Sequence, residues 1–317
     1  MDLKELTDQL RAFQPRNYNW TFALYHAQKS KDGVCLNWNR CAMEGIGEWA
    51  EEHRRLLLEK KLQEACVTEY SPLLQPKEEI GFLETGNELI REQMHGILNA
   101  IPNADQHAPE DFANGVVNKP HGYVFYGKPG KKALDANPEA TDVLLWRRAN
   151  PFIPWSKTLL CAGINGTVKE SENPILQFKP QTDFLMIAGH CFFLSEAVSK
   201  DLDLESRAAA VCDKRLSQLE EADILSNYEM MQLTAIGTKH TRKFLDFNRE
   251  VLEHVKSLSI SGRADFLSPF GISLDPAGKL DCFDEETCAL IIDLFCGRVC
   301  IDVLGRLSTG KEIRVLE

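Results

Sequence analysis

Hydrophobic residues recur with two different periods along the chain. Leu3, Leu6 and Leu10 are spaced as on one face of a helix, while residues 20–26 alternate as in a strand. The Glu-, Lys- and Arg-rich segment 47–66 also has a helical composition. Between residues 121 and 195, short apolar segments separated by turn residues predict consecutive strands. The spacing then returns to three and four residues, which predicts helices over residues 204–219, 227–236, 244–258 and 284–295.

This order of elements predicts an α+β fold, with antiparallel sheet in the N-terminal and middle parts and a mainly helical C-terminal part. The strands follow one another directly, whereas a parallel doubly wound sheet needs a helix between successive strands. A β-hairpin is expected inside the helical part, because Asp275-Pro276-Ala277-Gly278 places turn residues between two short segments of strand-like sequence.

The segment from residue 102 to residue 120 is rich in Pro, Gly, Asn and Asp, which is typical of a loop or linker. We therefore expect a domain boundary here, with an N-terminal α/β region over residues 1–118 and a second domain over residues 119–317. The second domain would contain a sheet over 121–195 and a helical part over 200–317. A long functional loop is the alternative interpretation of the same segment.

The composition is that of an ordinary globular protein of 317 residues, with 44% hydrophobic and 26% charged residues. Such a chain buries a sizeable core, which excludes extensive disorder. No stretch approaches the roughly 18 apolar residues of a transmembrane helix, and the N-terminus does not resemble a signal peptide. A cytoplasmic protein is therefore expected. The net charge of −11 argues against a generally basic nucleic-acid or membrane binder.

The ten cysteines are expected to be buried free thiols, because a large chain without an export signal does not depend on disulfides. Cys282, Cys288, Cys296 and Cys300 form a grouping that suggests zinc. However, Cys288 lies on the apolar stripe of the last predicted helix, and zinc ribbons usually have two-residue ligand spacings. We therefore predict core thiols, with no metal and no cofactor.

No strong catalytic signature occurs in the sequence. The phosphate-binding loops GxxxxGK[ST] and GxGxxG are absent, as are the motifs HExxH and GxSxG of metallo- and serine hydrolases. The eight histidines are scattered, and no two have a metal-ligand spacing on one element. No catalytic residue is predicted, and a site assembled from scattered carboxylates stays open as an alternative.

One segment departs from the acidic average of the chain. Residues 119–157 contain seven Lys and Arg against three acidic residues, a net charge of +4, which leaves −15 for the remainder. Six aromatic residues lie in the same segment. Cations release phosphate counterions and aromatic rings stack on bases, so this pattern suits nucleic acid. The candidate binding residues are Lys128, Lys131, Lys132, Arg147 and Arg148. In the alternative interpretation, the aromatic rings are core and the lysines are merely solvated.

A second, weaker basic group comprises Lys239, Arg242 and Lys243, at the start of the helix predicted over residues 244–258. Backbone amides at a helix N-terminus favour anions, whereas cations there oppose the helix dipole. A bound phosphate would offset that cost. These three side chains are therefore further candidates for contacts to nucleic-acid phosphates.

The order of several segments over residues 140–317 resembles a known family. The segments are Asp142-Val143-Leu144-Leu145-Trp146-Arg147-Arg148-Ala149, Thr182-Asp183-Phe184-Leu185-Met186-Ile187, Thr241-Arg242-Lys243-Phe244, Gly278-Lys279-Leu280 and Asp302-Val303-Leu304-Gly305. In this order and pattern the chain resembles the KwaB-like proteins, the soluble components of the Kiwa antiphage defence system.

The resemblance implies a non-enzymatic antiphage protein that binds DNA and blocks phage replication or transcription. It also implies an integral-membrane partner of the KwaA type, which would recruit the protein to the inner face of the membrane, and assembly into a homodimer. A two-fold dimer would bring two basic segments together. The alternatives are a nuclease or nucleotide hydrolase with a carboxylate site, and a scaffold that only docks other proteins.

Overall fold

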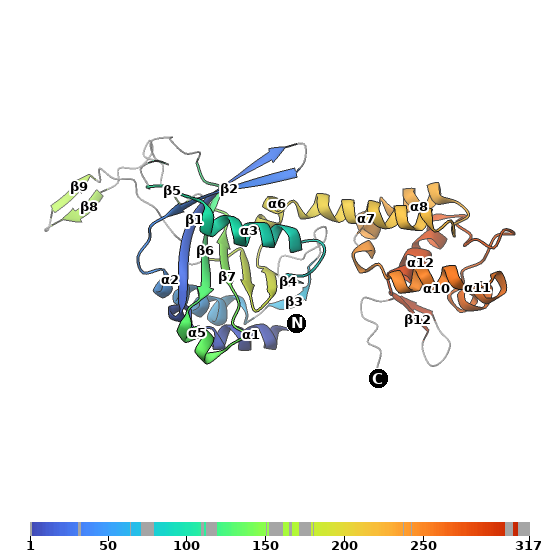
Figure 1. The fold of residues 1–317 in the computed structure, drawn as a ribbon, viewed down its shortest axis with the longest axis horizontal. Coiled ribbons are helices and arrows are strands. Elements are labelled where there is room, and N and C mark those ends of the chain that lie inside the picture. Colours follow the sequence, from blue (N-terminus) through green and yellow to red (C-terminus); the bar gives the residue numbers. More distant parts are fainter. Residues whose placement is uncertain are drawn as a thin grey trace. The chain divides into compact units, whose positions relative to one another are not determined.

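The computed structural model of the protein consists of two compact units, Met1–Leu204 and Glu205–Glu317 (Figure 1). The structure describes residues 2–30, 33–63, 65–70, 79–108, 111, 119–149, 151, 161–164, 167–170, 179, 181–236, 238–241, 243–301 and 307–309.

A nine-stranded sheet forms the centre of the first unit, in the order β3-β4-β11-β10-β7-β6-β1-β2-β5 (Figure 1). The strands are β1 (Tyr18–Ser30), β2 (Gly33–Cys41), β3 (Cys66–Glu69), β4 (Glu79–Glu84), β5 (Asp105–Gln106), β6 (Gly122–Pro129), β7 (Val143–Arg147), β10 (Phe184–Ile187) and β11 (His190–Phe193). A separate pair is formed by β8 (Cys161–Ile164) and β9 (Thr167–Glu170).

Neighbouring strands of the sheet are antiparallel except for two pairs at its ends, β2 with β5 and β3 with β4, which are parallel. The predicted α+β class is therefore confirmed, with a mixed rather than wholly antiparallel sheet. The β10–β11 hairpin turns at Ala188 and Gly189, which both have positive φ angles of 50° and 75°. Two such residues in succession are what a tight hairpin turn between right-twisted strands requires.

Both faces of the sheet are buried, and this explains why its central strands are continuously apolar and aromatic. Helices α1 (Leu3–Ala12) and α2 (Ile46–Leu56) contribute Leu6, Leu10 and Ala50 to a core shared with Phe125 of β6. Helix α3 (Arg91–Asn103) contacts β1 and β2. In β6, every residue from Gly122 to Gly127 is buried.

Helix α2 is shorter than the composition of residues 47–66 predicted. The α-helix ends at Leu56 and continues as a single π-helical turn, Leu57–Lys61. Strand β3 begins at Cys66 and pairs with β4, so the chain must leave the helix before that point. The turn ends on two adjacent lysines, Lys60 and Lys61, which are exposed.

The two units divide at residues 204 and 205, at the start of helix α7 (Leu204–Glu221). The boundary expected at residues 118 and 119 lies inside the first unit, because β6 pairs with β1 in the same sheet, with Phe125 opposite Phe22. Strands from both sides of residue 118 thus share backbone hydrogen bonds. The sheet expected over residues 121–195 belongs to the same unit as the N-terminal region.

The second unit is mainly helical around one core, to which Leu216, Phe244, Ile291, Ile292 and Phe295 contribute. Its elements are α7, α8 (Tyr228–Ala235), α9 (Thr238–Thr241), α10 (Arg249–Ser257), α11 (Ile260–Leu267), α12 (Glu285–Phe295), β12 (Val299–Ile301) and β13 (Leu307–Thr309). The mainly helical C-terminal part is therefore confirmed.

The helix predicted over residues 244–258 starts later than its hydrophobic spacing indicated. A 3₁₀ turn covers Lys243–Asp246, and α10 begins at Arg249. The Asn248 side chain accepts hydrogen bonds from the backbone amides of Glu250 and Val251, which caps the helix there. Phe244 and Phe247 are nonetheless buried. Their helix-like spacing therefore reflects burial along a 3₁₀ turn and the helix that follows it, rather than one continuous helix.

The predicted hairpin in the second unit is present as a tight turn closed by one antiparallel bridge, between Leu274 and Leu280. The Asp275 amide donates to the Lys279 carbonyl at 2.8 Å, and the Asp275 carboxylate accepts from the amides of Ala277 and Lys279. Gly278 has a φ of 80°, which glycine adopts without strain. The residues on either side of this bridge do not extend it into a pair of strands.

Four cysteines of the second unit are buried free thiols, as predicted: Cys212, Cys282, Cys288 and Cys296. In the first unit Cys41 and Cys191 are buried too, whereas Cys35 and Cys66 are exposed, so the prediction of burial is wrong for these two strand residues. The Cys300 side chain lies outside the described residues. Within the described ranges, no three His, Cys, Asp or Glu side chains are arranged to hold a metal ion.

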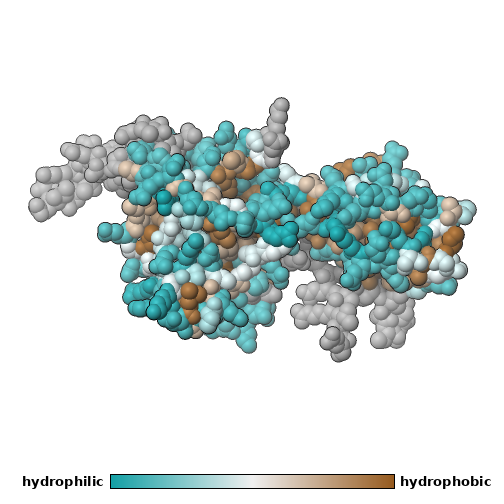
Figure 2. Space-filling view, in the orientation of Figure 1, coloured by the Kyte–Doolittle hydropathy of each residue, from teal (hydrophilic) through white to brown (hydrophobic). Residues whose placement is uncertain are grey.

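The surface carries no large apolar feature in the view of Figure 2, where hydrophobic residues form small separate patches on a mostly hydrophilic face. The exposed large hydrophobic side chains of the described residues are Leu134, Leu233, Ile236, Ile260 and Phe283. Among the helices that the structure describes, none combines the length and the hydropathy needed to cross a bilayer.

Candidate functional site

The basic residues predicted on the 119–157 segment do not form one surface, because the strand register separates them. β6 and β7 are antiparallel, with Tyr123 opposite Arg147. Lys128 lies five residues further along β6, about 17 Å away at the usual rise of a strand. Lys131 and Lys132 start helix α5 (Lys131–Ala136), beyond the Lys128 end of the strand. All three lysines are exposed, at the opposite end of β6 from Arg147.

The aromatic residues of the same segment belong to the core wherever the structure describes them. Tyr123, Phe125, Tyr126 and Trp146 are at most 1% exposed. Rings buried to this extent are not available to stack on bases. The core interpretation is therefore correct for these four, and the other two aromatic residues of the segment lie outside the described residues.

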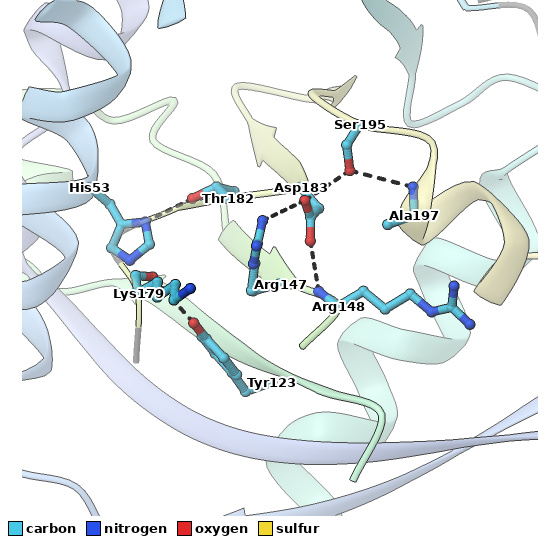
Figure 3. A network of polar contacts seen from close by, with 9 residues as sticks. All are labelled: His53, Tyr123, Arg147, Arg148, Lys179, Thr182, Asp183, Ser195 and Ala197. Atoms are coloured by element: carbon cyan, nitrogen blue, oxygen red, sulfur yellow. Dashed lines mark hydrogen bonds and ion pairs between the residues drawn. The ribbon is translucent and has the colours of Figure 1, made fainter. Parts of the chain in front are cut away.

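Arg147, at the end of β7, forms an ion pair with Asp183, which precedes β10. Arg147 Nη1 donates to Asp183 Oδ1 at 2.8 Å, and the Asp183 side chain is only 7% exposed. The register of β7 and β10 pairs Trp146 with Phe184, so it sets Arg147 and Asp183 opposite each other. Figure 3 shows the two side chains pointing toward one another.

Asp183 also receives hydrogen bonds from two further groups (Figure 3). The Ser195 hydroxyl donates to Oδ1 and the Arg148 amide donates to Oδ2, each at 2.8 Å. The Asp183 carbonyl accepts from the amides of Leu194 and Ser195, which follow β11. One buried carboxylate thus holds together the ends of β7, β10 and β11, with its hydrogen-bonding capacity satisfied.

Arg148 makes its side-chain contact with a different acid, since successive side chains of an extended chain point to opposite sides. Its Nε lies 3.1 Å from Oδ2 of Asp201, in helix α6 (Ala197–Asp201). The Tyr25 hydroxyl donates to the same oxygen at 2.5 Å. Burial raises the pKa of both Tyr25 and Asp201. The side chains of the two adjacent arginines therefore form ion pairs with separate carboxylates.

Arg147 lines a pocket of about 550 Å³, and three lysines that sequence reasoning did not single out line it too. Lys60 and Lys61 come from the turn after α2, and Lys179 comes from the segment before β10. With Asp183 as the one acid, these four cations give the lining a net charge of +3, in a chain of net charge −11. The remaining lining residues are Leu56, Leu57, Gln181, Thr182, Leu194 and Ser195. We call this the Arg147 pocket.

A second pocket of the first unit lacks the cationic lining of the Arg147 pocket. It has a volume of about 260 Å³ and lies between α1, α5 and the β10–β11 turn. Glu139 is the one charged residue among those that line it. The two pockets therefore differ in charge, and the cations lie around the Arg147 pocket.

His53 of α2 supports the Arg147 pocket from within the core. Its side chain is buried, and its Nδ1 lies 2.8 Å from the Thr182 hydroxyl oxygen (Figure 3). Burial, followed by the nearby Arg147 guanidinium, lowers the pKa of His53 to about 4. The ring is therefore neutral at neutral pH. It holds Thr182 in place and adds no charge to the pocket.

Tyr123 fixes the backbone at Lys179, another cation that lines the pocket. Its hydroxyl donates to the Lys179 carbonyl at 3.2 Å (Figure 3). Burial raises the pKa of Tyr123 to about 12, so the phenol keeps its proton and stays a donor. Lys179 itself is exposed and lines the pocket.

The second predicted basic group is largely engaged or not described. Lys243 forms an ion pair with Asp293 at 2.6 Å, and both side chains are 12% exposed. Arg242 and the side chain of Lys239 lie outside the described residues. The amides at the start of α10 are capped by Asn248, so Lys243 does not stand at an open helix end.

Sequence reasoning identified Arg147 but missed the residues that complete its site. Lys60 and Lys61 occur in a segment rich in Glu, Arg and Lys, where they are indistinguishable from a solvated helix face. Lys179 lies outside the basic segment 119–157 in the sequence, after residues with a strand-like pattern. These residues come together only in the folded chain, where the end of the sheet, the end of a helix and a loop converge on one pocket.

The chain matches no protein-family model, no curated protein and no solved structure. The lining of the Arg147 pocket combines four cations, two hydroxyl groups and three leucines around one hollow, a combination that suits an anion.

Proposed function

We propose that the protein binds nucleic acid through its phosphates, with the Arg147 pocket as the centre of the contact. The observation that carries this proposal is the concentration of Lys60, Lys61, Lys179 and Arg147 around one hollow of an acidic protein. Such a local positive field attracts phosphate, whereas the acidic remainder of the chain repels it. Phosphate contacts of this kind provide sequence-independent affinity.

In this proposal the protein is a non-enzymatic effector of the Kiwa type. It would bind phage DNA, block replication or transcription, and act with an integral-membrane partner that holds it at the inner face of the membrane. Assembly into a homodimer would double the number of Arg147 pockets along one duplex. The resemblance of residues 140–317 to KwaB-like proteins supports this part of the proposal.

Salt-dependent binding tests the phosphate contact. A fluorescent 30-base-pair duplex is titrated with the protein by anisotropy, from 50 to 300 mM salt. We expect the logarithm of the affinity to fall linearly with the logarithm of the salt concentration. Lys60→Glu with Lys61→Glu should weaken binding at least tenfold and reduce the slope by about 2.

Two other double variants make the test specific. Lys131→Glu with Lys132→Glu introduces the same charge change at the opposite end of β6. Lys4→Glu with Lys29→Glu introduces it at exposed lysines outside both predicted sites. If either weakens binding as much as the Lys60 and Lys61 pair, the Arg147 pocket is not the centre of the contact. Cleavage of the duplex with Mg²⁺ present, abolished by a single carboxylate substitution, would instead indicate a nuclease.

A further inference from the structure

We propose that the Arg147 pocket binds one phosphorylated nucleotide, either free or at an unpaired strand end. This inference rests on the proposed function, since it specifies which form of nucleic acid enters the pocket. It follows from the size of the pocket, from the division of its lining into cationic and apolar parts, and from an unused donor on Arg147.

The volume of the pocket suits one small molecule rather than a double helix. About 550 Å³ falls within the range of roughly 300 to 1,000 Å³ that is usual for small-molecule sites. A duplex, whose major groove alone is about 12 Å wide, touches a hollow of this size only at its rim. Lys60, Lys61 and Lys179 are exposed and accessible from the rim, whereas the Arg147 side chain is only 22% exposed. A ligand that engages Arg147 must enter the pocket.

The lining offers separate partners for the two ends of a nucleotide. The four cations suit a terminal phosphate, which carries more charge than a backbone phosphodiester and three strong acceptor oxygens. Leu56, Leu57 and Leu194 provide aliphatic surface against which a base or sugar can pack. The side chains of Gln181, Thr182 and Ser195 can form hydrogen bonds to the polar edge of the base or to the sugar hydroxyls.

Arg147 retains donors that its ion pair does not use. A guanidinium has five N–H donors, and the hydrogen bond to Asp183 comes from Nη1. Its Nε is buried and has no hydrogen-bond partner among the described residues. A buried donor without a partner is costly, so a shift of the side chain that brings this N–H onto a phosphate oxygen would be favourable. Asp183 meanwhile holds the guanidinium in a fixed orientation, as a preformed site requires.

Isothermal titration calorimetry with 5′-AMP, adenosine and inorganic phosphate tests the inference on the full-length protein. We expect 5′-AMP to bind and adenosine not to bind. Inorganic phosphate should bind at least tenfold more weakly than 5′-AMP, because it lacks the part that packs on the leucines. Lys60→Glu with Lys61→Glu should lower the 5′-AMP affinity at least tenfold. Lys4→Glu with Lys29→Glu should leave it unchanged.

A second arm identifies the source of the nucleotide. A (dT)₁₀ strand with a 5′-phosphate is compared with the same strand bearing a 5′-hydroxyl. Tighter binding of the phosphorylated strand, with 5′-AMP as competitor, indicates a strand end, whereas equal binding of the two strands indicates a free nucleotide. If 5′-AMP neither binds nor competes while the duplex still binds through Lys60 and Lys61, the inference is wrong and the proposed function stands. If the wild-type protein shows no salt-dependent binding of the duplex, the proposed function itself is wrong.

Discussion

Arg147 and Asp183 form a hydrogen-bonded ion pair, 2.8 Å long, across the paired strands β7 and β10. The same carboxylate binds the backbone of Arg148 and the hydroxyl of Ser195. Asp183 thus has two effects that act in opposite directions. It stabilises the end of the sheet, and it cancels one positive charge of the Arg147 pocket.

Asp183→Asn should therefore weaken the fold and strengthen anion binding at the same time. The substitution keeps the shape but removes the charge, and we expect a stability loss of about 1–3 kcal/mol. The net charge of the pocket lining rises from +3 to +4, so duplex affinity should increase several-fold. Urea unfolding followed by tryptophan fluorescence measures the first effect, because all five tryptophans lie in the first unit.

Asp142→Asn is the matched control for that variant. Asp142 accepts a hydrogen bond of 2.6 Å from the Tyr126 hydroxyl, just before β7 and away from its Arg147 end. The change in net charge is the same, but the pocket is untouched. An equal gain in affinity from Asp142→Asn would show that the general charge of the protein, and not the pocket, governs binding.

His53 should make the stability of the first unit depend on pH. Its pKa is lowered from 6.5 to about 4 in the folded protein, so the unfolded chain binds a proton that the folded chain excludes. The contribution to stability is fully present above pH 6.5 and is lost as the pH falls toward 4. Between pH 7.5 and pH 5 the loss should be about 2 kcal/mol.

The pH effect is measured by urea unfolding at both pH values in the wild type and in His53→Gln. The variant lacks the titrating group, so its pH-dependent loss should be smaller by that amount. An unchanged pH dependence in His53→Gln would show that other groups cause it.

Gly122 should not tolerate even one added methyl group. A Cβ at this position would lie 2.2 Å from the Arg147 carbonyl oxygen and 2.6 Å from Cε1 of Tyr25. Gly122→Ala must therefore push β6 away from β7 beside the pocket, at a cost of about 3 kcal/mol or more. Lower duplex affinity should accompany this loss of stability.

Gly96→Ala provides the comparison for the glycine variant. Gly96 lies in α3, is exposed, and has open space around the added Cβ. Alanine should therefore stabilise the helix by about 0.5–1 kcal/mol. Similar thermal melting of the two alanine variants would contradict the close approach of β6 and β7.

Lys243 should matter for the second unit and not for anion binding. Lys243→Met leaves Asp293 largely buried without its partner, so we expect a loss of about 2–4 kcal/mol. Lys243→Met with Asp293→Leu should recover most of it, because the pair is then replaced by apolar packing. Far-UV circular dichroism follows the helices of this unit, while tryptophan fluorescence reports that the first unit is unchanged. Weaker duplex binding by both variants would restore Lys243 as a phosphate ligand.

The prediction of the elements was most successful where a local pattern has one physical meaning. The alternation in residues 20–26 and the Ala188-Gly189 turn gave β1 and the β10–β11 hairpin in their correct places. The pattern failed where one spacing has two explanations. Phe244 and Phe247 are spaced as in a helix, yet they are buried by a 3₁₀ turn followed by the separately capped α10.

The site was harder to predict than the elements, because proximity in sequence does not give proximity in space. Lys128 and Arg147 belong to one basic segment, but antiparallel pairing places them at opposite ends of β6. Lys60 lies 87 residues before Arg147 and lines the same pocket. The aromatic residues were ambiguous in the same way, since rings suited to stacking on bases are equally suited to a strand buried on both faces.

The sequence by itself determined the α+β class, the change from strands to helices near residue 200, and the buried thiols of the second unit, because these depend on residue spacing and hydropathy. The tertiary structure decided that one sheet joins residues on both sides of position 118, and that cations from three separate segments surround one pocket. Strand register and the packing of helices on a sheet are non-local. They fix which charges meet, and no local pattern contains that information.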